Sequence, residues 1–96
     1  MNAIEVIKVV NPAEAITDSA ARVADLIGDR LHRRETPVVV LMHGLRGVPS
    51  SFFNAILVRL VSQFGVESLD VVNFEFDSEL QRGTFTRTLQ AMRKTA

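Results

Sequence analysis

The sequence predicts an α/β domain with the element order β-α-β-α-β-α, in which helices pack on a small, mostly parallel sheet. Three apolar runs of strand length occur, at 4–10, 38–42 and 69–76, and each precedes a stretch whose apolar residues have helical spacing. The segments between successive runs are long enough for right-handed parallel connections. The 96 residues, 47% of them apolar, are expected to form one domain, 1–96, with a modest core.

Residues 4–10 are rich in Ile and Val and are predicted to form the first strand. A helix then begins either at Asn11-Pro12, where Asn is a favoured N-cap and Pro a favoured first helical residue, or later, with Thr17 or Asp18 as its cap. Pro37 ends the helical region. The apolar stripe of this helix recurs at three- and four-residue spacing and comprises Ile16, Ala20, Val23, Ala24, Ile27 and Leu31.

The run at 38–42 is continuously apolar, which is typical of a central parallel strand with both faces buried. A loop with Gly44 and Gly47 follows it. Residues 49–64 are predicted to form the second helix, and Gly65 is its natural C-cap. The buried stripe of this helix comprises Phe53, Ile56, Leu57, Leu60, Val61 and Phe64.

The third strand is predicted at 69–76, where apolar and polar residues alternate, so that only one face is buried, as in a strand near a sheet edge. Asp77 or Ser78 is expected to cap the last helix, which runs from Glu79 to about residue 93. Its predicted core residues are Leu80, Phe85, Leu89 and Met92.

The composition argues against several classes of function. Eleven Lys plus Arg balance eleven Asp plus Glu, so the basic excess of a nucleic-acid-binding surface is missing. The chain has no Cys and two His far apart, so neither a disulfide nor a metal site is expected. No nucleotide-binding glycine motif occurs, and no cofactor is expected. No apolar run has membrane-spanning length, and the N-terminal run contains charges, so a cytoplasmic protein is expected.

The loop after the second predicted strand has two interpretations. In the first, the segment from His43 to Gly47 resembles the His-Gly-x-x-Gly loop of α/β-hydrolases, whose backbone N–H groups stabilise an oxyanion. That family also needs a nucleophile on a Gly-x-Ser-x-Gly elbow, which the sequence lacks. The corresponding function is a small hydrolase-like catalytic fragment that uses His43 and Gly44 and is completed by another chain.

In the second interpretation, nearly the whole chain is similar to the STAS domain, the fold of bacterial anti-sigma-factor antagonists. It looks closest to the STAS-like family of unknown function. The likeness rests on the apolar strand at 38–42, a loop containing Gly44, the helix start Ser50-Ser51-Phe52 and the helix that follows. The strand around 71–74 and the terminal helix continue the same order.

This resemblance implies a regulatory protein-binding module and not an enzyme. In the antagonists, a partner kinase phosphorylates the first serine of the pair and the complex is released; the resemblance puts that role on Ser50. It implies a serine kinase or ATPase of the histidine-kinase-like ATPase fold as the partner. Antagonists usually carry Asp before the pair and Gly after it, where this chain has Pro49 and Phe52. The expected partner-binding residues are Arg46, Ser50, Ser51, Phe52 and Asn54.

Purely structural roles are the alternative for these residues. Ser50 and Ser51 are favoured N-cap residues, and His43 would be a hydrogen-bonded loop residue. Phe52 adjoins Phe53, so one ring points away from the helix stripe; an exposed Phe52 would anchor a partner, whereas a buried one would pack under the preceding loop. The chain as a whole could also be a structural subunit that forms a homodimer through a sheet face.

Overall fold

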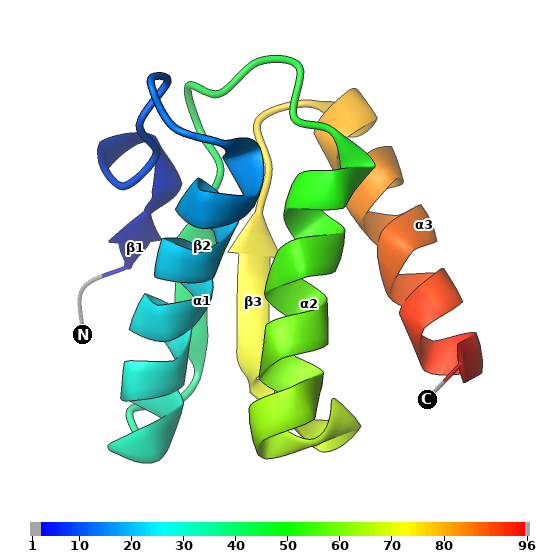
Figure 1. Ribbon diagram of the computed structural model, residues 1–96. Helices are drawn as coiled ribbons and strands as arrows, with labels where there is room; N and C mark the ends of the chain where they lie inside the picture. Colours follow the sequence, from blue (N-terminus) through cyan, green and yellow to red (C-terminus); the bar gives the residue numbers. More distant parts are fainter. Residues whose placement is uncertain (1–2, 96) are drawn as a thin grey trace.

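The computed structural model describes residues 3–95, and within them three parallel strands form one sheet in the order β1-β2-β3 (Figure 1). The predicted α/β class with a small parallel sheet is confirmed. The strands are β1 (Ile4–Glu5), β2 (Val38–Leu41) and β3 (Val72–Glu75). The helices are α1 (Ile16–His32), α2 (Ser50–Phe64) and α3 (Glu79–Thr95), with short 3-10 segments at Val6–Lys8 and Val66–Val71.

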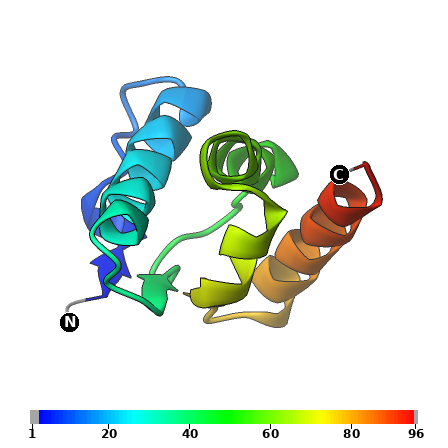
Figure 2. The ribbon, with the colours of Figure 1, turned by 90° about the horizontal axis from the view of Figure 1, so that it is seen from below.

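The helices do not enclose the sheet. Helices α1 and α2 lie on the same side of it, and α3 packs against α2 beyond β3 (Figures 1 and 2). In β2, Val38 and Val40 are buried beneath this layer, whereas Val39 and Leu41 on the other face are half-buried. The prediction that both faces of the central strand are buried is therefore wrong, because no described element covers the second face.

The first strand is shorter than the predicted run at 4–10. It pairs with β2 over Ile4–Glu5 only, where its last partner is Leu41, the final residue of β2. A strand needs a hydrogen-bonded neighbour to satisfy its backbone groups. Beyond this point the chain turns instead, and the N–H of Val10 donates to the carbonyl of Val6 at 3.0 Å.

Helix α1 begins between the two predicted starts, after Asn11-Pro12 and before a helix capped by Thr17 or Asp18. Its N-cap is Ala15, and its first residue, Ile16, precedes the predicted caps Thr17 and Asp18. The Asn11 side chain accepts a backbone N–H two residues on, at 3.0 Å, and so forms an Asx turn. Because this turn satisfies the backbone locally, Asn11-Pro12 belongs to the loop and not to the helix.

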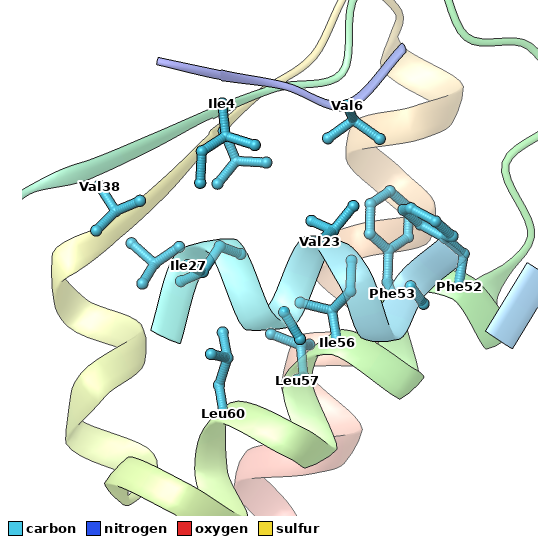
Figure 3. Close-up of a cluster of buried hydrophobic side chains, with 14 of the residues drawn as sticks. Ile4, Val6, Val23, Ile27, Val38, Phe52, Phe53, Ile56, Leu57 and Leu60 are labelled. Atoms are coloured by element: carbon cyan, nitrogen blue, oxygen red, sulfur yellow. The ribbon is translucent and has the colours of Figure 1, made fainter. Parts of the chain in front are cut away.

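The core lies between the sheet and the layer of α1 and α2 (Figure 3). Phe53 is fully buried at the centre of a cluster of aromatic side chains in this core. Its ring meets four other rings edge-on at centroid distances of 5.4 to 6.2 Å. Those rings belong to Phe52, Phe74, Phe76 and Phe85. The predicted helix stripes are confirmed for the buried residues Ala20, Val23, Ala24, Ile27, Ile56, Leu57 and Leu60.

The remaining boundaries differ by a few residues. Gly65 ends α2 as predicted, since its N–H donates to the carbonyl of Val61 at 2.9 Å. Residues 66–71 form a 3-10 segment, so β3 is shorter than the predicted strand at 69–76. Ser78 caps α3, because its hydroxyl accepts the N–H of Gln81 at 3.1 Å. Leu80, predicted to lie in the core, is 75% exposed, because the first turn of α3 faces the loops and not the sheet.

Candidate functional site

The carboxyl ends of the parallel strands lead into loops that gather at one end of the molecule, at the top of Figure 1. In open parallel sheets this is the end at which ligands bind. The central loop, residues 42–49, follows β2 and carries the predicted site residue Arg46. It borders three hollows that are lined by the described residues.

The three hollows differ in their walls. The first hollow, of about 370 Å³, lies between the segment leading into α1 and the central loop and is mostly apolar. The second hollow, of about 650 Å³, lies between the start of α2 and α3. The third hollow, of about 690 Å³, lies between the central loop and the start of α3. The central loop is therefore a ridge with a concave surface on each side.

A buried glutamine holds this ridge in place. Gln81 of α3 is 5% exposed, and its Nε2 donates to the carbonyl of Leu45 at 2.8 Å and to that of Met42 at 3.3 Å. Its Oε1 accepts the N–H of Asp77 at 3.3 Å, and the Asp77 carboxylate accepts the N–H of Gly44 at 2.9 Å. Gln81 and Asp77, with their bonds to the central loop, form a clamp on that loop. The sequence did not predict this clamp, because a glutamine on a helix is usually solvated and the partners of Gln81 lie far away along the chain.

The clamp also bears on the hydrolase-like interpretation. The N–H of Gly44, which an oxyanion hole would need, already donates to the negative carboxylate of Asp77. His43 is exposed, and it makes no hydrogen bond or ion pair with any described residue, so its predicted hydrogen bond is not formed. Among residues 3–95 the structure therefore pairs no serine nucleophile with His43.

The two loop glycines differ in what surrounds them. Both have positive φ, 86° at Gly44 and 61° at Gly47. A Cβ added at Gly44 would lie 2.7 Å from Cδ1 of Ile7, whereas nothing lies within 4 Å of one at Gly47.

The close atom is the end of the Ile7 side chain, which is 47% exposed and can move aside at little cost. We therefore expect Gly44→Ala and Gly47→Ala to lose similar amounts of stability, about 1 kcal/mol each, from the left-handed backbone. Urea denaturation of the two variants measures the losses, and a clearly larger loss for Gly44→Ala would show that Ile7 is held in place.

Ser50 and Ser51 occupy the first two positions of α2, and both are exposed. Pro49, with an extended backbone, is the N-cap, and no side chain caps this helix. The interpretation of the two serines as N-cap residues is therefore wrong. The first N–H groups of a helix lack intrahelical partners and make its N-terminus the positive end of the helix dipole. The two serine hydroxyls lie at this end of α2.

Exposed arginines lie near this helix start. The side chains of Arg46 in the central loop and of Arg87 in α3 make no ion pair or hydrogen bond with the described residues. Arg87 borders the second hollow together with Ser50, Ser51 and Asn54. Sequence reasoning missed Arg87, because only the packing of α3 on α2 brings it beside the serine pair.

Phe52 does not belong to this surface as an exposed anchor. It is 2% exposed, and its ring lies beside Phe53 in the buried cluster (Figure 3). The hypothesis of an exposed contact residue is therefore wrong, and the alternative, packing beneath the preceding loop, is confirmed. The other predicted partner-binding residues, Arg46, Ser50, Ser51 and Asn54, are all exposed around the start of α2.

No family model, curated protein or solved structure matches this chain. Its fold and site define a parallel α/β domain with exposed serines and arginines at the carboxyl end of the sheet. No grouping of described His, Asp or Glu side chains has the arrangement of a metal site. The described helices include none with the length and apolar character needed to cross a membrane.

Proposed function

We propose that this chain is a STAS-like regulatory module of the cytoplasm that binds a protein partner through the surface around residues 46–54 and is released by phosphorylation of Ser50. The observation that carries the proposal is the exposure of Ser50 at the first position of α2, where it has no capping role. The Ser50 residue is therefore accessible at the surface of the protein. The module has no catalytic role of its own.

Phosphorylation at this position would change the charge of the surface while leaving the fold intact. A phosphate adds a charge of about −1.5 to −2 at neutral pH, and a helix N-terminus favours it. Arg87 borders the same hollow as Ser50, and Arg46 lies in the adjoining loop. The phosphate would form ion pairs with these arginines, so an acidic partner would lose the positive charges that it binds and would dissociate.

The resemblance supplies the partner class, a serine kinase or ATPase of the histidine-kinase-like ATPase fold. The two departures from the antagonist pattern have structural roles in this chain. Pro49 takes the N-cap position of α2, and Phe52 fills the core beneath the central loop. Neither departure removes the exposed serine pair, so the hydroxyl on which the proposed switch depends is retained.

The test is an affinity pull-down from native lysate with the wild-type chain, Ser50→Asp and the control Ser62→Asp, which changes an exposed serine near the far end of α2. We expect the wild type and the control to recover a histidine-kinase-like ATPase and Ser50→Asp to recover at least tenfold less. An acidic residue in the first turn stabilises a helix by about 0.3–1 kcal/mol, so Ser50→Asp should remain folded in a thermal melt.

Equal recovery by Ser50→Asp and wild type would contradict the switch and leave the binding module. Recovery of nothing but the chain itself would contradict the module and favour a self-assembling subunit. A reduced melting temperature of Ser50→Asp would show that the serine hydroxyl has a structural role, although it does not cap α2 in the structure.

A further inference from the structure

We propose, on the basis of the partner-binding function above, that the first hollow receives an aliphatic side chain of the partner and that Arg46 binds a carboxylate next to it. The occupant is therefore an acidic peptide segment that carries Leu, Ile or Met beside Asp or Glu. This assigns a second contact area to the central loop, on the side opposite the serine pair.

The first hollow is shaped for an apolar group. Phe52 and Val10 contribute to its lining, Leu45 and Val48 of the central loop are half-buried beside it, and Ile16 borders it while 42% exposed. Its volume of about 370 Å³ is at the small end of ligand pockets, which run from roughly 300 to 1,000 Å³. A single side chain with its flanking backbone therefore suits it better than a large cofactor.

One wall of the hollow is already held in place by polar contacts. The buried Ser19 hydroxyl accepts the N–H of Asn11 at 3.3 Å and donates to the Glu14 carboxylate at 2.7 Å. Arg22 forms an ion pair with Glu14 and donates to the carbonyl of Val9 at 2.9 Å. Because the wall is ordered before binding, little conformational entropy is lost when a side chain enters.

The charges at the hollow select the flanking residue of the partner. Glu14 is the only acidic residue among those described that borders the first hollow, and Arg22 and Ser19 already engage it. Arg46 borders both the first and the third hollow and has no ion pair with the described residues. A carboxylate beside the aliphatic anchor would therefore find an uncompensated guanidinium, whereas a basic segment would be repelled.

The experiment selects a displayed library of random peptides on the intact protein and maps the enriched peptides by amide chemical shifts. We expect enriched sequences with an aliphatic residue next to Asp or Glu, and shifts centred on Ser19, Gly47 and Val48. Ile16→Glu should weaken their binding at least tenfold. The matched control is Leu26→Glu, because Leu26 is 40% exposed on the same helix and does not border the hollow.

Arg46→Gln should weaken the acidic peptides about tenfold and abolish their advantage over the same peptides with Asn or Gln in place of the acid. Enriched peptides without an acidic-aliphatic pair, or no enrichment at all, would overturn the inference. Shifts confined to the second hollow would also overturn it while leaving the proposed function standing, whereas binding far from both the central loop and α2 would contradict both.

Among the described residues, exposed acidic-aliphatic pairs occur at Asp25-Leu26, Asp70-Val71 and Glu79-Leu80. A second copy is therefore the other occupant to test. Sedimentation distinguishes it: a dimer that disappears in Ile16→Glu and also in Leu26→Glu, Val71→Glu or Leu80→Glu would assign the hollow to a second copy and overturn the partner peptide. A monomer at the concentrations used for peptide binding is the result that the inference requires.

Discussion

Replacement of Phe53 by alanine is expected to lower the free energy of unfolding by about 3–5 kcal/mol. The ring is fully buried and meets four other aromatic rings, so its removal leaves a cavity that rigid neighbours cannot fill. Since domains of this kind are stable by about 5–15 kcal/mol, the loss is a large fraction of the total. Urea denaturation followed by circular dichroism measures it.

The control is Leu80→Ala. Leu80 matches the apolar pattern of a core residue but is 75% exposed, so its truncation should change the free energy of unfolding by no more than about 0.5 kcal/mol. Phe53→Leu, which keeps part of the apolar volume, should lie between the two variants. A loss for Leu80→Ala as large as that for Phe53→Ala would mean that the Leu80 side chain packs against other elements, contrary to its exposure in the structure.

Replacement of Gln81 by leucine is expected to lower the free energy of unfolding by about 1–3 kcal/mol. Leucine has a similar volume, but it leaves the carbonyls of Met42 and Leu45 and the N–H of Asp77 without their partner. The cost of unsatisfied buried groups exceeds the gain from a more apolar side chain. Urea denaturation measures the loss, and hydrogen exchange shows where the structure loosens.

The position of the loss in the chain distinguishes a clamp from a general packing effect. If Gln81 holds the central loop to α3, the Gly44 amide, which donates to Asp77, should exchange faster in Gln81→Leu. Gln90→Leu, at an exposed glutamine of the same helix, should change neither the stability nor this amide. Unchanged protection of Gly44 in Gln81→Leu would show that the loop keeps its position without the glutamine.

The clamp matters for the proposed function because the central loop carries Arg46. Asp77 and Gln81 tie that loop to the start of α3, and α3 also carries Arg87. The two arginines are therefore held on connected elements at the same end of the molecule. Loosening the loop should weaken peptide binding at the first hollow even though Gln81 does not border it.

The sequence by itself determined the features that depend on neighbours a few residues away. The class, the order of the elements and the stripes of α1 and α2 follow from hydrophobic periodicity, which is a local pattern. Gly65 at the end of α2 and Ser78 at the start of α3 follow from capping, which joins residues within one helical turn. The predicted start of α2 at residue 49 lies one residue from the observed start at Ser50, although the serines do not cap the helix.

Only the tertiary structure decided what depends on contacts between distant segments. The first strand stops at Glu5 because β2 offers no further partner, although the apolar pattern continues to Val10. Phe52 turns inward and Leu80 outward according to where other elements lie, and Gln81 becomes a buried clamp through acceptors on another loop. Each of these outcomes is set by packing and hydrogen bonding across the fold, which a local sequence pattern does not encode.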